Sequence, residues 1–204
     1  MDPTKKRPVL SPQLAELRLE IETASHKAIS IGKGLSPAQL AQRPQPDKWS
    51  IADCLTHLNI TSKEYVTLLS AAIEGAPRNI PSSARPFKIG LMGKLFKWTL
   101  EPPPRFRTPT PAKFQPISLP PQDNALFMFL NLQEQLTAIV VRADGVAIDH
   151  IKVQSPFSRR MKYNVFAALN IVMAHERRHL WQAEQVRKEL GIQRTHEMRS
   201  AERE

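Results

Sequence analysis

Apolar residues recur at intervals of three and four positions along four long stretches of the chain, the spacing of one face of an α-helix. The stretches cover residues 11–31, 51–74, 122–143 and 161–190 of the 204-residue sequence. The inward stripe of the first consists of Leu14, Leu17, Ile21, Ala24 and Ala28. That of the second consists of Ile51, Cys54, Leu55, Leu58, Ser62, Tyr65, Leu69 and Ala72. No run of alternating strands and no internal repeat accompanies them, so the pattern predicts an all-α fold, a four-helix bundle.

Capping residues predict where the helices begin and end. Ser11 precedes Pro12, which predicts a hydroxyl cap followed by proline in the first turn. Ser50 is followed three residues later by Asp53, which predicts a capping box with aspartate in place of the usual glutamate or glutamine. Ser36-Pro37 predicts one further helical turn between the first two long helices. The predicted helix ends coincide with Gly32 and Gly34, Gly75, Gly145 and Gly191.

Residues 76–121 interrupt the helical pattern between the second and third stretches. They hold more than half of the chain's 18 prolines, together with several basic and aromatic residues. Because proline lacks a backbone N–H and restricts the residue before it, most of this insertion is predicted to be irregular. Within it, residues 87–100 predict a short amphipathic helix with its apolar side around Leu91, Leu95 and Trp98. A connection of this length is typical of a functional segment or a cover.

The predicted domain organisation is simple. Residues 11–191 form one bundle that includes the proline-rich insertion, with an N-terminal tail of residues 1–10 and a polar C-terminal tail of residues 192–204. The single cysteine, Cys54, excludes an intrachain disulfide and is typical of a reducing compartment. No signal-peptide pattern and no apolar run long enough to span a bilayer is present. We therefore expect a cytoplasmic protein without a membrane partner.

The chain carries a formal net charge of +10. An excess of this size can indicate a nucleic-acid partner, but here the basic residues are dispersed and no nucleic-acid-binding motif accompanies them. A solvated basic surface is the favoured interpretation, and nucleic-acid binding is the minor alternative.

Candidate chemistry is concentrated in the last helix, where His175 and His179 lie four residues apart. At that spacing the two imidazoles are about 40° apart in projection and share a face. The same face carries Val165, Ala168, Leu169, Val172, Ala183, Val186 and Leu190. His57 lies on one margin of the stripe of the second helix. Three imidazoles can thus converge inside the bundle and bind a metal with a fourth position left open, or they are ordinary buried histidines.

The segment His175-Glu176-Arg177-Arg178-His179 formally matches the H-E-x-x-H pattern of zinc peptidases. The downstream third ligand and the upstream sheet of such enzymes are missing, so we do not predict a peptidase. Glu176 falls on the opposite flank of the stripe from His175. It is expected to be a packing-edge or salt-bridge residue, pairing with Arg177 or a neighbouring helix, or alternatively to orient an imidazole.

Several other residues have structural interpretations. Cys54 is expected to be a small apolar filler rather than a metal ligand. Trp49 is expected to pack as the hydrophobic lead-in to the second helix, and Trp181 to project away from the ligand face, toward a subunit interface or the insertion. The histidines expected to be ordinary surface or loop residues are His26, His150 and His196.

Two segments taken together, KWSIADCLTHL and the later HERRHLWQAEQVRKEL, resemble the DinB/YfiT-like metal-binding proteins. The resemblance spans about residues 11–191 and includes the loop GLSPAQLAQRPQPDKWS. It implies an up-down-down-up bundle with a metal site formed by His57, His175 and His179. The matching positions are Trp49, Ser50, His57, His175, Arg178, His179 and Gln182.

Characterised branches of this family include thiol-dependent S-transferases and isomerases that use bacillithiol, mycothiol or glutathione, and many members have no assigned reaction. The resemblance implies a metal-dependent S-transferase or hydrolase acting on a small-molecule substrate, with a low-molecular-weight thiol. Zinc or nickel is the expected metal because imidazole nitrogens suit both. A homodimer is compatible with a bundle of this kind, although no surface in the sequence indicates one. The alternative is a non-catalytic bundle that binds metal or a small ligand. The basic residues expected to border the pocket and meet an acidic cosubstrate are Lys94, Lys97, Arg105 and Arg107.

Overall fold

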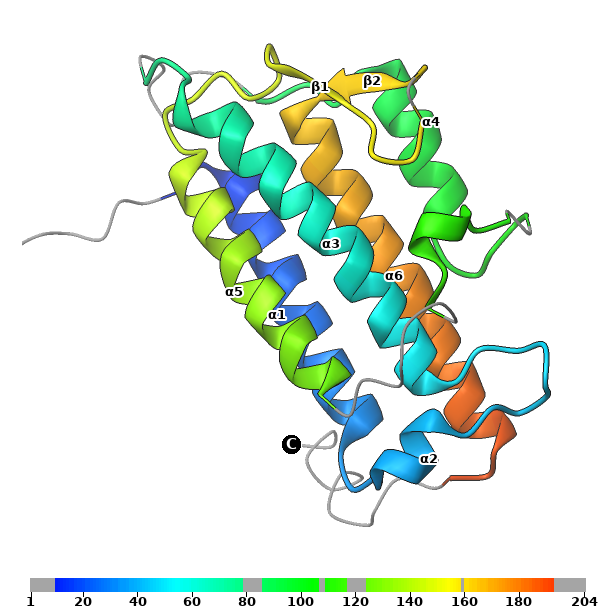
Figure 1. Cartoon of the computed structure of the whole chain (residues 1–204). Coiled ribbons are helices and arrows are strands. Elements are labelled where there is room, and N and C mark those ends of the chain that lie inside the picture. The colour runs from blue at the N-terminus through cyan, green and yellow to red at the C-terminus, as the bar shows by residue number, and fades with distance from the viewer. Residues whose placement is uncertain (1–9, 79–85, 107–108, 117–123, 159, 193–204) are drawn as a thin grey trace, which may run out of the picture.

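The computed structural model describes residues 10–78, 86–106, 109–116, 124–158 and 160–192 (Figure 1). The long helices are α1 (Pro12–Gly32), α3 (Ile51–Glu74), α5 (Ala125–Arg142) and α6 (Val165–Glu189). The shorter elements are α2 (Pro37–Ala41), α4 (Leu91–Leu100), the 3-10 turn η1 (Ala112–Phe114) and the strands β1 (Lys152–Gln154) and β2 (Lys162–Asn164). The predicted all-α fold is confirmed.

The four long helices form a bundle in which α3 packs against α5 and α6, and α1 packs against the same two helices. Figure 1 shows that α3 and α5 run in one direction and that α1 and α6 run in the other. The long connection between α3 and α5 therefore crosses from one end of the bundle to the other, and α4 is part of that crossover. This is the up-down-down-up topology implied by the family resemblance.

Two of the predicted helix starts have the expected caps. The Ser50 hydroxyl accepts a hydrogen bond from the Asp53 backbone N–H at 3.0 Å, and the Asp53 carboxylate accepts one from the Ser50 N–H at 2.9 Å. Ser36 and Gln39 form the equivalent box at α2.

The predicted hydroxyl cap at Ser11 is wrong. The backbone N–H of Leu14, which such a cap would bind, donates instead to the Ser11 carbonyl at 2.9 Å. The Ser11 hydroxyl is consequently buried without a hydrogen-bond partner in the described part of the chain.

The segment before α6 differs from the prediction of a helix from residue 161. Lys162–Asn164 instead pair antiparallel with Lys152–Gln154, with Val153 opposite Tyr163. The helix begins only at Val165, where the Asn164 side chain accepts a hydrogen bond from the Ala167 N–H at 2.7 Å. Strand pairing with a distant segment overrode the local helical pattern here. The predicted start of the third helix at Gln122 lies outside the described residues, as do most of the two tails.

The short helix predicted in the insertion exists as α4, and the apolar residues that marked it in the sequence lie on its outer side. Leu91, Leu95 and Trp98 face solvent, with 83%, 53% and 48% of their surface exposed. The opposite side packs on α6, and a Cβ added at Gly93 would lie only 2.6 Å from the Cβ of Ala167. Because α4 covers α6, residues 165–176 of α6 are buried on every side. None of the described helices is both long and apolar enough to cross a membrane.

Candidate metal centre

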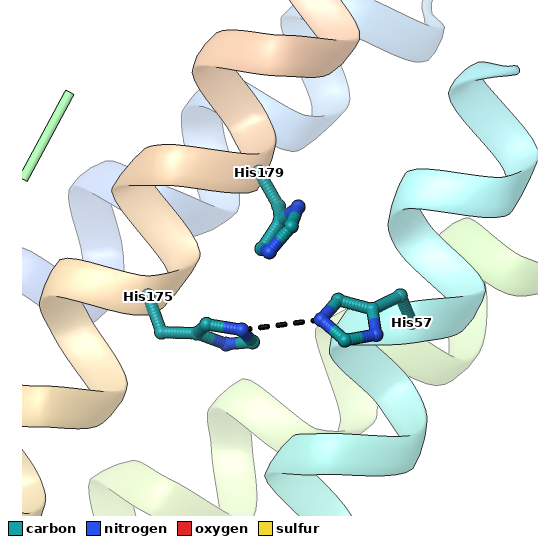
Figure 2. Close-up of side chains that lie close together, drawn as sticks. All are labelled: His57, His175 and His179. Carbon is teal, nitrogen blue, oxygen red and sulfur yellow. Dashed lines mark hydrogen bonds between the residues drawn. The ribbon is translucent and has the colours of Figure 1, made fainter. Parts of the chain in front are cut away.

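Three imidazoles meet between α3 and α6 (Figure 2). His57 projects from α3, and His175 and His179 project from successive turns of α6. All three are buried, and one ring nitrogen of each lies within 4.8 Å of the others. The Nε2 atoms of His57 and His175 are 3.1 Å apart. The structure thus brings together the three residues that the sequence singled out.

Local sequence explains how each imidazole is aimed. On α6 the i, i+4 spacing places both side chains over the same face, as the helical wheel predicts. On α3 the Ser50–Asp53 capping box fixes the helix start shortly before His57. The packing of α3 against α6 then closes the distance between the two helices.

Hydrogen bonds to ring nitrogens define the tautomers of two of the histidines. The Nδ1–H of His57 donates to the backbone carbonyl of Phe114 at 2.7 Å, since a carbonyl oxygen can only accept. The Nδ1–H of His179 donates in the same way to Oε1 of Gln182 at 2.9 Å. In both rings Nε2 therefore carries the lone pair, and the tautomer suits metal ligation through Nε2.

The distance between the Nε2 atoms of His57 and His175 is compatible with a shared ion. Zinc–nitrogen bonds of about 2.0–2.1 Å at tetrahedral angles place two ligand nitrogens about 3.4 Å apart. The observed separation is 3.1 Å. Without a cation, His175 must donate a proton from Nε2 to the lone pair of His57, whereas a metal bound by both nitrogens replaces that proton. The residues present therefore fit a divalent ion.

The environment keeps the three imidazoles neutral. Burial lowers the pKa of His175 and His179 well below the ordinary histidine value, and the neighbouring imidazoles and Arg178 lower it further. Burial also lowers the pKa of His57, although the bond to Phe114 opposes the shift. Because only the neutral imidazole has a lone pair to offer, the site is ready for a metal at neutral pH.

Aromatic side chains surround the imidazoles. The Trp49 ring stacks on His179 at a centroid distance of 5.7 Å and tilts against His57 at 5.0 Å. Phe157 comes from the turn between β1 and β2. The centroid of its ring lies 5.7 Å from that of the His175 ring and 4.7 Å from that of the Phe114 ring. Trp49 therefore precedes α3, as expected, and also contacts two of the three imidazoles. Periodicity could not identify Phe114 or Phe157, because Phe114 lies in the three-residue turn η1 and Phe157 in the turn between β1 and β2, both too short to show a repeat.

Glu176 is neither a packing-edge nor a salt-bridge residue, so that expectation is wrong. Its side chain is fully buried, and Oε1 accepts hydrogen bonds from Ser62 at 3.2 Å and from Gln133 at 2.9 Å. Oε2 has no hydrogen-bond partner in the described part of the chain. Burial raises the pKa of this carboxyl from 4.5 to about 7. Glu176 is enclosed because its side chain points into the bundle, where Ser62 of α3 and Gln133 of α5 donate hydrogen bonds to it.

Arg177 and Arg178, which follow Glu176, bind the proline-rich insertion to the bundle. Arg177 forms ion pairs with Glu20 of α1 and Glu101, which follows α4. Arg178 donates to the backbone carbonyls of Thr99 at 3.1 Å and Phe106 at 2.9 Å. Arg178, one of the positions that match the family, therefore holds the connection between α3 and α5 against α6.

None of the other candidate ligands in the described part of the chain belongs to the histidine cluster. Lys94 and Lys97 line a groove of about 830 Å³ between α1, α4 and α6, which none of the three histidines lines. The Arg105 guanidinium lies over the Trp98 ring at 4.8 Å. Cys54 is buried with its pKa raised by burial, as expected of a packing residue. His26 and His150 are exposed, Trp181 is half-buried, and Arg107 and His196 lie outside the described residues.

Comparison with known families agrees with this architecture. The model of the DinB superfamily matches residues 20–183, a range that runs from α1 into α6 and contains all three histidines. Searches of curated proteins and of solved structures found no significant match. Because the family match covers most of the chain and the helical bundle with it, this chain belongs to the DinB superfamily.

Proposed function

We propose that His57, His175 and His179 bind one divalent metal ion through Nε2, and that the protein is a metal-dependent enzyme of the S-transferase or hydrolase type. The observation that carries this proposal is the meeting of three buried, neutral imidazoles, two of them held by their Nδ1–H bonds in the tautomer that frees Nε2. Membership of the DinB superfamily supports it independently.

Zinc and nickel are the metals that we propose, since imidazole nitrogens suit both. An ion of this kind would lower the pKa of a nearby water or thiol and so supply a nucleophile near neutral pH. Neighbouring residues of the protein orient the imidazoles and shield them from water. Phe114 and Gln182 hold the protons on Nδ1 of His57 and His179, while Trp49 and Phe157 exclude water from the rings.

The proposed substrate, assembly, location and domain bounds each rest on a different observation. The small-molecule substrate and the low-molecular-weight thiol are proposed on the family resemblance, and the homodimer because a helical bundle of this kind can pair with a second copy. A cytoplasmic location follows from the single, unpaired Cys54. A single domain over residues 11–191 is supported by the packing of α1, α3, α5 and α6 against one another.

Metal content tests the site itself. Protein purified, stripped and reloaded with zinc or nickel should hold about one ion per chain by mass spectrometry. His179→Ala should hold a small fraction of that, because two ligands bind far more weakly than three. His26→Ala, which removes an exposed histidine of α1, is the matched control and should load fully. A wild-type protein that takes up neither metal would overturn the proposal.

One observation favours the alternative of a non-catalytic metal-binding bundle. The side chains of all three histidines are almost fully buried, with residue exposures of 3%, 7% and 8%. Burial this deep leaves little of the imidazole surface for a substrate to reach, and a site that only holds an ion does not need such access. Transfer assays with an aryl halide electrophile and glutathione, mycothiol or bacillithiol, together with ester hydrolysis assays, separate the two. Activity that is lost in His179→Ala supports the enzyme, and inactivity at full metal loading supports the bundle.

A further inference from the structure

Exposed apolar side chains are concentrated on and just after α4. Half of the exposed large hydrophobic residues in the described part of the chain fall between residues 91 and 106. They are Leu91, Met92, Leu95, Trp98 and Phe106. Trp98 and Phe106 are neighbours, with ring centroids 6.3 Å apart. We refer to these five residues as the α4 surface.

The fold of the bundle does not require the α4 surface to be apolar. The helix is held on α6 by its other side, where Gly93 is buried and Phe96 and Leu100 pack against the core. Figure 1 shows α4 beside α6 on the outside of the four-helix bundle, and a groove separates it from α1. Solvent-facing leucine and tryptophan on such a helix therefore indicate contact with something outside the chain.

The charges around the α4 surface are mainly positive. Residues 86–106 contain four basic residues and one acidic residue. Lys94 is exposed beside the apolar stripe, and the Arg105 guanidinium lies 4.8 Å from the centroid of the Trp98 ring. The acidic residue, Glu101, is already engaged by Arg177. Glu16 and Glu20 are on α1, at the groove between α1 and α4.

We propose that the α4 surface binds the surface of an anionic lipid bilayer. Leucine, methionine and tryptophan exposed on a lysine-bearing helix, with a phenylalanine just after it, are the features of helices that lie in the interface of a membrane without crossing it. The basic rim complements anionic headgroups, and the tryptophan suits the headgroup level. Binding of this kind needs no spanning segment, so the lack of one in the sequence does not oppose it. The inference is independent of the metal site.

Two other occupants fit the same surface less well. In a symmetric dimer the same positively charged surface of both copies would meet, and like charges brought together weaken an interface. Nucleic acid would match the basic residues, but phosphate offers nothing to Leu91, which is the most exposed of the five side chains. An anionic bilayer satisfies the apolar and the basic residues together.

Vesicle co-sedimentation of the full chain tests the proposal. The wild type should bind vesicles of equal phosphatidylcholine and phosphatidylglycerol at low salt, and bind phosphatidylcholine vesicles roughly tenfold more weakly. Leu95→Glu, and independently Leu91→Glu, should reduce binding to the acidic vesicles by roughly tenfold or more. The matched control is Phe127→Glu, which places the same charge on an exposed apolar position of α5, and should bind within about twofold of wild type.

Every other result either supports or overturns the proposed binding of the α4 surface to a bilayer. Absence of binding to acidic vesicles at low salt overturns the proposal, and so does equal weakening by Leu95→Glu and Phe127→Glu, which would mean nonspecific charge attraction. A dimer in light scattering that Leu95→Glu dissociates, without vesicle binding, identifies the α4 surface as an interface between copies. A vesicle-induced blue shift of tryptophan emission that disappears in Trp98→Phe supports insertion of the α4 surface, and a shift that persists contradicts it.

Discussion

His57, His175 and His179 differ from the exposed histidines of the chain in what surrounds their ring nitrogens. Two of them donate from Nδ1 to an oxygen atom, and all three are buried with lowered pKa values. Ligand spacing on α6 could be predicted from the sequence because it is a property of one helix. The carbonyl oxygen of Phe114 could not be predicted, because Phe114 lies 57 residues from His57, in the short turn η1 of the proline-rich insertion.

The hydrogen bond from His57 to Phe114 leads to a prediction about metal affinity. Phe114 is 1% exposed, and its buried ring anchors the turn that carries the accepting carbonyl. Phe114→Ala should therefore weaken metal binding roughly 10–100-fold, the usual effect of losing a partner that orients a ligand. Competition with a chromophoric chelator measures it. Phe166→Ala also removes a buried phenyl ring from the bundle, and it should lower stability without a comparable loss of affinity.

The buried carboxyl of Glu176 leads to a prediction about stability and pH. Burial raises its pKa from 4.5 to about 7, so the folded protein holds this proton more tightly than the unfolded chain does. The resulting stabilisation is complete below about pH 4.5 and is lost as the pH rises through about 7. A glutamine side chain cannot ionise, so Glu176→Gln does not lose stability in this way as the pH rises.

The expected signature is a difference between two urea-unfolding series on metal-free protein. From about pH 5 to about pH 8, the stability of Glu176→Gln relative to wild type should increase by roughly 3 kcal/mol. The histidines are common to both proteins, so their titration largely cancels in the difference. A difference that does not change with pH would show that Glu176 is not a buried acid.

At the scale of elements, the contact between α4 and α6 depends on the absence of a side chain at Gly93. The sequence indicated a helix over residues 87–100 but not which side faces the bundle, because α4 has apolar residues on both sides. Leu91 and Leu95 form one apolar side, and Phe96 and Leu100 form the other. The close approach of Gly93 to Ala167 selected the second side.

Gly93→Ala should therefore destabilise the protein, although alanine favours helix over glycine by about 1 kcal/mol. The added Cβ would lie 2.6 Å from the Cβ of Ala167, so α4 must move away from α6. We expect a net loss of about 1–3 kcal/mol in thermal or urea unfolding. The control is Gly75→Ala, where an added Cβ meets nothing within 4 Å, and its stability should stay within about 0.5 kcal/mol of wild type.

At the scale of the whole molecule, the proposed metal would link two helices that are distant in sequence. His57 of α3 and His175 of α6 are separated by 118 residues, so an ion bound by both favours the folded chain over the unfolded one. Metal at about 100 times its dissociation constant adds about 2.7 kcal/mol of stability.

Chelation should thus lower the midpoint of thermal unfolding by roughly 5–10 °C for a chain of this size. Calorimetry with and without excess zinc measures the effect. His179→Ala should show little difference between the two conditions, whereas His26→Ala should respond as the wild type does. An equal response of both variants would place the stabilising metal elsewhere on the molecule.

Periodicity and capping act within a few residues, so the four long helices, most of their ends and the pairing of His175 with His179 could be predicted from the amino-acid sequence. Four features could be found only in the folded chain: the outward side of α4, the hydrogen bonds from α3 and α5 that enclose Glu176, the strand pairing before α6 and the carbonyl that accepts from His57. Each of these depends on segments that are distant in the chain and meet only when the bundle closes. Local pattern carries no information about such meetings, since their free energy comes from packing between elements.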